Sequence, residues 1–201
     1  MTLDHRKDIR RRPVTGLFRR LLARRDGATA IEFGILCIPF FVVIFASVET
    51  FVAFSAEQLL VSATDTMARK LRTGEITYNL GRSTDLTEAQ FRKALCDEIA
   101  IVITCSADEI KKPNKLLVDV RSFAKFSDIP RAVPVTNEML DTSAFRFAPG
   151  GKKSINIVRA YYRWDIVTDI IRPFIANVRA PDGSRNYLMM ATTVIQNEEY
   201  P

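Results

Sequence analysis

Apolar residues dominate one segment near the start of the chain and then thin to a one-sided pattern. The residues from Phe33 to Val48 carry no charge, and a helix of this length measures about 24 Å. With the weakly polar flanks, residues 28–54 reach about 40 Å, against a hydrocarbon core of roughly 30 Å. The pattern therefore predicts one membrane-spanning helix.

The apolar residues that follow recur at steps of three and four positions, with charged residues between them. This spacing is typical of an amphipathic helix that packs one face against a core. The apolar span and this amphipathic segment together predict one helix from about Ala28 to Arg72, which ends at Thr73 and Gly74. Because Pro39 lacks a backbone donor, we expect it to kink the helix inside the membrane. The stripe consists of Val52, Ala56, Leu59, Leu60, Ala63, Met67 and Leu71.

A second helix is predicted after a polar loop at residues 74–86. Thr87 is a suitable N-cap and Gln90 stands three positions later, which is the spacing of a capping box. Beyond Pro113 the apolar period changes to two, as expected for strands. The segments predicted as strands are residues 115–126, 154–167 and 187–196, and residues 128–150 are predicted to be mostly loop.

These elements predict an α+β fold. A long N-terminal transmembrane and amphipathic helix precedes a small domain with a mostly antiparallel sheet. The expected division is a basic leader at residues 1–27, the helix at residues 28–73 and an outer domain at residues 74–201.

The positive charge of the chain is concentrated at its N-terminus. Residues 1–27 hold nine of the 29 basic residues and three of the 23 acidic ones, which leaves 20 of each sign after Gly27. A basic arm beside an apolar span indicates topology, with the arm cytoplasmic and residues after about 55 outside. Since the excess charge belongs to this arm, we expect no nucleic-acid partner.

The apolar segment has two other interpretations. A buried core helix of a soluble protein is disfavoured because "PFFVVIF" offers no polar face. A cleaved secretory signal would use Ala53-Phe54-Ser55 as its small-residue site, with the mature chain starting at Ala56. The apolar run is longer than an ordinary signal core, and Glu49 lies just upstream of that site.

The outer domain offers little catalytic chemistry. His5, in the basic arm, is the only histidine, which excludes Ser-His-Asp and Cys-His arrangements and most zinc sites from the domain. No Gly-rich phosphate loop is present. Asp165 and Asp169 are interpreted as solvated strand residues. We therefore expect no enzyme activity, cofactor, metal or small-molecule substrate.

Two arginines on one predicted strand could imitate a nucleic-acid surface. Arg159 and Arg163 share a face because they are four residues apart, and Tyr161 and Trp164 lie near them. A solvated face of the sheet is the favoured interpretation.

The three cysteines are divided between the predicted span and the outer domain. Cys37 lies in the span, where a thiol is a small apolar group, whereas Cys96 and Cys105 lie in the outer domain, where oxidation is normal. On an unbroken helix the latter two would be about 13.5 Å apart, beyond the disulfide reach of roughly 7 Å. Either the helix ends between them, near Ile103, and they pair, or they are two buried free thiols.

A glutamate, Glu32, interrupts the leading edge of the apolar segment in "RDGATAIEFGILCIPFF". A carboxylate at the centre of a membrane helix costs ~2.5–3.5 kcal/mol on insertion scales, and less near its ends. The basic leader ending in Gly27, the glutamate shortly after it and the apolar helix resemble the class III prepilin signal of type IV pilins. The proline-containing helix and the α+β domain resemble the architecture of those pilins.

Within that superfamily the sequence resembles TadE-like minor pseudopilins of the Tad (tight adherence, Flp) pilus system. The similar features are "GATAIEFGIL", the cysteines flanking a helix end, "LLVDVRSFAKF" and the tail "ATTVIQNEEY". Relatives often end in Asn-Glu-Pro-aromatic, and here Glu199 replaces the proline. TadF-like and TadG-like proteins remain as alternative assignments.

The resemblance implies roles for three residues. A prepilin peptidase would cut after Gly27 and create an α-amine at Ala28, and the Glu32 carboxylate would pair with its own or an adjoining subunit's amine. The implied protein is a single-pass inner-membrane subunit with a periplasmic domain, whose partners are the peptidase and other pilin-like subunits in pilus biogenesis and adhesion. The alternative is an uncleaved single-pass protein whose outer domain binds a ligand or partner.

Overall fold

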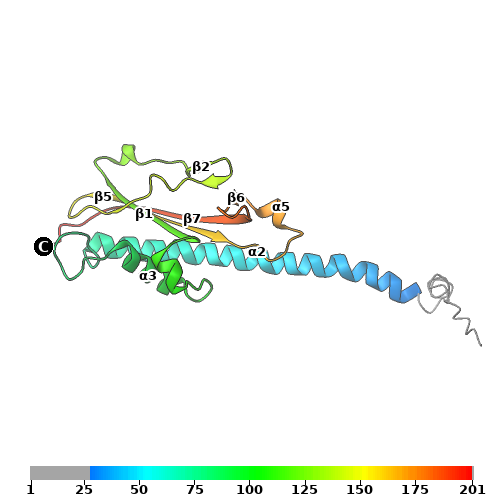
Figure 1. Ribbon diagram of the computed structural model, residues 1–201. Helices are drawn as coiled ribbons and strands as arrows, with labels where there is room; N and C mark the ends of the chain where they lie inside the picture. Colours follow the sequence, from blue (N-terminus) through cyan, green and yellow to red (C-terminus); the bar gives the residue numbers. More distant parts are fainter. Residues whose placement is uncertain (1–27, 201) are drawn as a thin grey trace, which may run out of the picture. The chain divides into compact units, whose positions relative to one another are not determined.

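The computed structural model describes residues 28–200 (Figure 1). By their internal contacts the residues form two units, 1–45 and 46–201, and the second is called the C-terminal unit below. The helices are α2 (Ala28–Thr73), α3 (Glu88–Ile99), α4 (Ala107–Lys111), the 3-10 helix η2 (Phe126–Asp128) and α5 (Arg172–Ile175). The strands are β1 (Leu116–Phe123), β2 (Val135–Thr136), β3 (Met139–Leu140), β4 (Phe147–Ala148), β5 (Ile155–Trp164), β6 (Val178–Arg179) and β7 (Arg185–Gln196).

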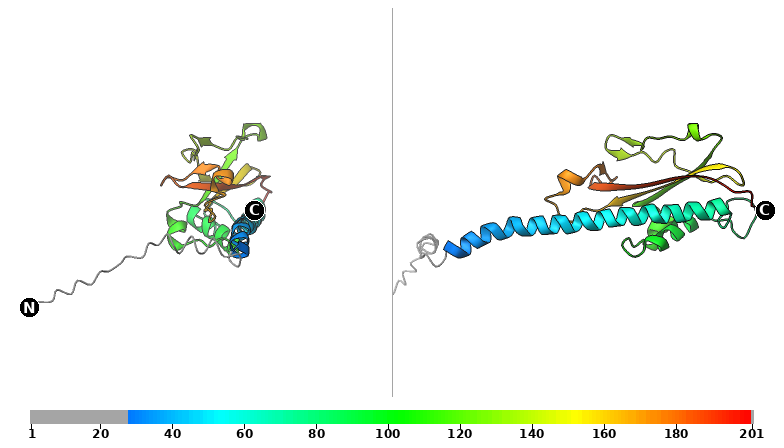
Figure 2. Two further views of the ribbon diagram at one scale, coloured as in Figure 1. Left: turned by 90° about the vertical axis from the view of Figure 1, so that its right-hand side faces the viewer. Right: turned by 180° about the vertical axis from the view of Figure 1, so that it is seen from behind.

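The α+β fold class is confirmed: a long apolar helix precedes a domain built on a mixed sheet. In the C-terminal unit the sheet forms one layer, and the later part of α2 forms a second layer together with α3 (Figures 1 and 2). The apolar stripe of α2 lies in the core between these layers. Its most deeply buried members are Ala56, Leu60, Ala63, Met67 and Leu71.

The start of α3 confirms the capping box predicted from the sequence. The Thr87 hydroxyl accepts from the Gln90 backbone N–H at 3.3 Å, and the Gln90 side chain accepts from the Thr87 N–H at 2.8 Å. These bonds satisfy backbone donors that the first turn of a helix leaves unpaired. Phe91, Leu95 and Ile99 then bury one face of α3 in the core.

The end of α3 allows its cysteine to pair. The helix ends at Ile99, four residues before the expected position near Ile103, and the chain turns there because Ile103 N–H donates to the Ile99 carbonyl. The turn brings Cys96 and Cys105 to a Cα–Cα distance of 6.0 Å, and the two are joined by a disulfide. Of the two interpretations left open by the sequence, the structure has the disulfide.

The sheet has seven strands in the order β2-β3-β6-β7-β5-β1-β4. The three long strands predicted from the sequence are β1, β5 and β7, and they pair antiparallel with β5 in the middle. The short strands complete the edges, and two of the pairs that they make, β1–β4 and β3–β6, are parallel. Three of these short strands, β2, β3 and β4, lie within the segment that the sequence predicted to be mostly loop.

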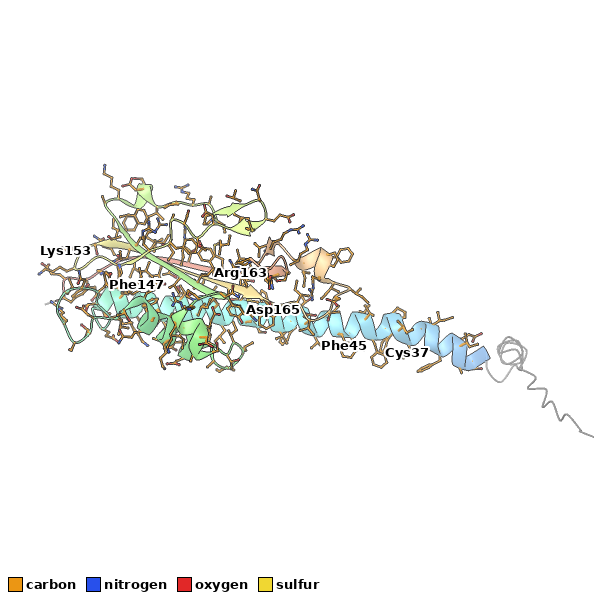
Figure 3. The ribbon with its side chains drawn as sticks, viewed as in Figure 1. Cys37, Phe45, Phe147, Lys153, Arg163 and Asp165 are labelled. Carbon is orange, nitrogen blue, oxygen red and sulfur yellow. A yellow bond between two sulfur atoms is a disulfide. The ribbon has the colours of Figure 1, made fainter. Side chains whose placement is uncertain are left out.

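The prediction of a solvated sheet face at Arg159 and Arg163 is wrong. These side chains are only 5% and 7% exposed. Residues 126–148 cross this face of the sheet (Figure 1), and Figure 3 labels Arg163 near the end of β5. Phe145 stacks on Tyr161 at 5.0 Å between ring centroids, and the guanidinium of Arg159 donates to the Pro130 carbonyl. A segment without periodicity of its own therefore covers the second face of β5.

The C-terminal tail closes the unit against the end of α2. The Glu198 N–H donates to the Arg72 carbonyl at 2.9 Å, and the Asn197 amide donates to the carbonyls of Gly150 and Gly151. Tyr200 is buried with its ring directly against Gly74. The C-terminal tail thus holds the last helical turn in place.

Gly74 should be the most sensitive glycine of this junction. Its φ is +78°, and a Cβ added there would lie 2.6 Å from the Tyr200 ring. Gly81 has a similar φ of +73° but open space around it. At either position, alanine would destabilise the folded state by about 1 kcal/mol because the backbone is left-handed. Only Gly74→Ala would also displace Tyr200.

We therefore expect Gly74→Ala to lower the midpoint of thermal unfolding clearly more than Gly81→Ala. Trp164, the single tryptophan, reports the transition by its fluorescence. Equal shifts in the two variants would contradict the packing of Tyr200 on this glycine.

Removing the disulfide should destabilise the C-terminal unit. A closed loop of this size contributes roughly 2–3 kcal/mol in the chain-entropy model. We expect Cys96→Ser or Cys105→Ser to lower the free energy of unfolding by that amount in denaturant titrations. Cys37→Ser, which removes the free cysteine of the apolar helix, is the matched control and should leave the transition unchanged. Alkylation of Cys96 and Cys105 in unreduced protein would contradict the pairing.

Candidate membrane and assembly segment

The first half of α2 exposes apolar side chains on every side. From Ile31 to Phe54 nearly all large apolar residues are exposed. Figure 3 labels the exposed Phe45 and the half-buried Cys37 on this part of the helix. Among residues 28–200, α2 is the one helix that is long and apolar enough to cross a membrane. Exposed apolar surface of this extent requires lipid or protein around it. The chain is therefore assigned as a single-pass membrane protein.

The predicted processing and assembly residues lie at the start of this helix. Ala28 is its first residue, and Gly27 lies outside the described residues. Glu32 is exposed and stands one turn after Ala28, the first residue of the helix. Pro39 lies inside α2, which continues through it. The kink at Pro39 and the roles of Gly27, Ala28 and Glu32 stay predictions.

Within residues 28–200 the Glu32 carboxylate has no hydrogen-bond or ion-pair partner, whereas the three later acids of α2 each have one. Glu49 accepts from the backbone N–H groups of Val167 and Thr168, at 2.5 and 2.8 Å. Asp65 accepts from the Thr193 hydroxyl of β7. Glu57 accepts from the Tyr187 hydroxyl at 3.0 Å. The three later acids therefore attach the helix to the sheet domain, whereas no described residue binds the Glu32 carboxylate.

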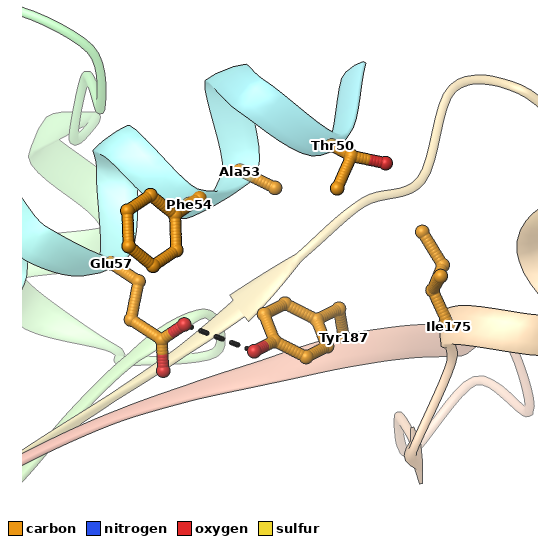
Figure 4. A pocket seen from close by; sticks show the side chains of 6 residues that line it. All are labelled: Thr50, Ala53, Phe54, Glu57, Ile175 and Tyr187. Carbon is orange, nitrogen blue, oxygen red and sulfur yellow. Dashed lines mark hydrogen bonds between the residues drawn. The ribbon is translucent and has the colours of Figure 1, made fainter. Parts of the chain in front are cut away.

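The bond between Glu57 and Tyr187 borders a small cavity of ≈ 200 Å³ (Figure 4). Its lining is otherwise mostly apolar, with Ala53 and Phe54 from the helix and Ile175 from α5. Burial and then the bond to the Glu57 carboxylate raise the pKa of Tyr187, so the phenol remains neutral and donating at physiological pH. The arrangement connects the helix to the sheet and offers no reactive group.

A larger hollow of ≈ 490 Å³ lies on the other face of the sheet. Its two cationic side chains are already paired: Arg163 donates to the Asn114 carbonyl at 2.5 Å, and Arg179 contacts Glu138 at 2.6 Å. Among the residues that the structure describes, no group of three or more His, Cys, Asp or Glu side chains could hold a metal ion.

Comparison with known families decides how this segment is classified. A family model described as TadE-like protein matches residues 27–69. This segment is TadE-like. The match begins at Gly27, includes Glu32 and the whole apolar span, and ends near the end of the amphipathic stripe. It covers about a fifth of the chain. No curated protein and no solved structure matches the chain.

Sequence reasoning missed the three attachments of α2 to the sheet domain. Glu49, Glu57 and Asp65 recur every eight residues, and on an α-helix each such step turns the side chain by about 80°. The three acids therefore do not mark one face of the helix, and their spacing gave no indication of their role. Their partners could not be inferred, because they lie more than a hundred residues away in the sequence.

The two kinds of carboxylate on α2 should respond differently to removal. Glu49→Ala leaves two backbone N–H groups without an acceptor, and we expect a loss of about 1–3 kcal/mol in the free energy of unfolding. Glu32→Ala removes no partner within residues 28–200 and should leave that free energy unchanged. Denaturant unfolding of both variants in detergent, followed by Trp164 fluorescence, measures the difference. Equal destabilisation would show that Glu32 also supports the fold.

Proposed function

We propose that the protein is a minor pseudopilin of the Tad/Flp pilus, a non-catalytic subunit needed for pilus biogenesis and adhesion. The observation that carries the proposal is the Glu32 carboxylate. It lies exposed at the start of an all-round apolar helix, inside the TadE-like segment and without a partner among residues 28–200. A charge in this setting is costly unless it has a function.

The proposed topology follows from charge. The basic arm at residues 1–27 stays in the cytoplasm, α2 crosses the inner membrane, and the C-terminal unit lies in the periplasm. An oxidising periplasm is consistent with the disulfide between Cys96 and Cys105.

Assembly in this proposal depends on a cut after Gly27 by a prepilin peptidase. The cut removes the basic leader and creates an α-amine at Ala28, at the positive end of the helix. In a bundle of apolar helices the amine of one subunit and Glu32 of another attract strongly, because little water screens them. The pair would set the axial position of each subunit among the other pilin-like subunits. Removal of the leader thus permits assembly.

Processing should depend on Gly27. We expect Gly27→Leu to leave the chain uncut, so that intact-mass spectrometry of the membrane fraction finds it heavier than the wild-type protein by the leader of residues 1–27. The wild-type protein should begin at Ala28. A wild-type chain beginning at Met1 or Thr2 would favour an uncleaved membrane protein whose outer domain binds a partner, and one beginning at Ala56 would favour a secreted protein.

Glu32 should be needed for assembly but not for insertion. We expect Glu32→Leu to enter the membrane at least as well as wild type, because a charge is removed from the apolar segment. It should fail to co-purify with other pilin-like subunits, since an unpaired amine in an apolar bundle can cost about 3–5 kcal/mol. Glu32→Gln, which keeps the shape but not the charge, should be nearly as defective.

Glu57→Gln is the matched control for these variants. It neutralises an acid of the same helix whose partner, Tyr187, lies within the C-terminal unit. We expect this variant to assemble. Normal piliation with Glu32→Leu would remove the main support for the proposed mechanism.

A further inference from the structure

The loop between β5 and β6 exposes an unusual amount of apolar surface. It comprises residues 165–177 and includes α5. Phe174 is 85% exposed, Val167 is 83% exposed and Ile170 is 61% exposed. Three large apolar side chains on one short loop form a patch that water solvates poorly.

The loop is bound to one particular turn of α2. Its Val167 and Thr168 N–H groups donate to the two oxygens of Glu49. Ile175 lines the same cavity as Thr50 and Phe54 of the helix, which Figure 4 shows from close by. The loop is therefore held beside residues 49–54 of α2.

The loop is also held internally, by Arg172. This guanidinium donates to the Ile166 carbonyl at 2.8 Å and contacts Asp169 at 2.6 Å. The backbone of the loop is thus held both by its hydrogen bonds to Glu49 and by the contacts that Arg172 makes within the loop.

This turn of the helix comes directly after the charge-free segment. That segment, from Phe33 to Val48, is about 24 Å long, whereas the hydrocarbon core is roughly 30 Å thick. In a helix whose charge-free segment crosses the membrane, the next turn, with the exposed Phe51 and Phe54, lies at the outer boundary of the hydrocarbon or just outside it. The loop attached to Glu49 lies at the same depth.

We propose that the β5–β6 loop is a second membrane contact, whose partner is the lipid surface itself. Val167, Ile170 and Phe174 enter the boundary between headgroups and acyl chains, to a depth of about 5–10 Å. The ion pair of Arg172 and Asp169 stays among the headgroups, as charged groups at an interface do. Lipid is favoured over a protein partner because the loop lies beside residues 49–54 of α2, where Phe51 and Phe54 are also exposed.

The contact would restrain the C-terminal unit at the membrane before assembly, because the unit then has two attachments to the bilayer. This inference uses the single-pass anchoring of the proposed function but depends on neither cleavage after Gly27 nor incorporation into a pilus.

Single-tryptophan variants test the proposal in the full-length chain. Since Trp164 is the only tryptophan, Trp164→Phe provides a background without one. Phe174→Trp then places the reporter in the loop. Phe41→Trp places it in the span, and Phe126→Trp places it at η2, an exposed site whose phenylalanine is not part of the loop. Each protein is reconstituted into phosphatidylcholine vesicles with bromine on the upper part of the acyl chains.

We expect the Phe174→Trp emission to be blue-shifted and strongly quenched by the brominated lipid, and the Phe126→Trp emission to be unaffected. Phe41→Trp should be quenched, which shows that α2 is inserted. Quenching at position 41 but not at position 174 overturns the loop contact and leaves the anchoring intact. No quenching at position 41 overturns the anchoring and the loop contact together.

Two further readouts keep the test decisive. A blue shift at position 174 without quenching by lipid would assign the patch to a protein neighbour and overturn the proposal. If Trp164→Phe disturbs folding, as judged by circular dichroism, Phe174→Trp is made with Trp164 kept. The quenching of the wild-type protein, which contains Trp164 alone, is then subtracted from that of the variant. If no quenching remains for the tryptophan at position 174, the proposal is overturned.

Discussion

The burial of one stripe of α2 beneath the sheet is the constraint on which the rest of the C-terminal unit depends. Leu60, Met67 and Leu71 are almost fully buried, and each such side chain contributes about 1.5–3 kcal/mol when it leaves water. The small residues Ala56 and Ala63 are buried in the same core. The capped helix α3 and the disulfide close the same core from its other side.

One helix thus serves two environments. Up to about Phe54 its surface is apolar on every side, which suits lipid or a bundle of similar helices, whereas further along only one side is apolar. The acids of the helix follow the same division. Glu49, Glu57 and Asp65 bind groups of the sheet domain, while Glu32 lies in the apolar part and finds no such group within residues 28–200.

Both ends of the amphipathic half are held by residues from the last third of the chain. The β5–β6 loop binds Glu49 at one end, and the C-terminal tail packs Tyr200 on Gly74 at the other. The helix and the sheet therefore form one mechanical unit.

The sequence by itself determined the features that depend on nearby residues. The apolar span, the amphipathic stripe, the capping box at Thr87 and Gln90 and the three long strands were all predicted, because helix and strand periods and capping are local. The resemblance of the N-terminal segment to TadE-like proteins was predicted too, since it lies in one continuous stretch of sequence, residues 27–69.

Only the tertiary structure decided how distant segments meet. The partners of Glu49, Glu57 and Asp65 lie 118 to 130 residues away, and no local pattern encodes such a pairing. Strands of two residues, such as β2 and β3, are too short to show a period. The segment that contains them therefore appeared to be loop, and the burial of Arg159 and Arg163 beneath residues 126–148 could not be foreseen. A polar side chain on a strand looks solvated until the segment that covers it has folded into place; for Arg159 this segment also supplies a hydrogen-bond partner, the Pro130 carbonyl.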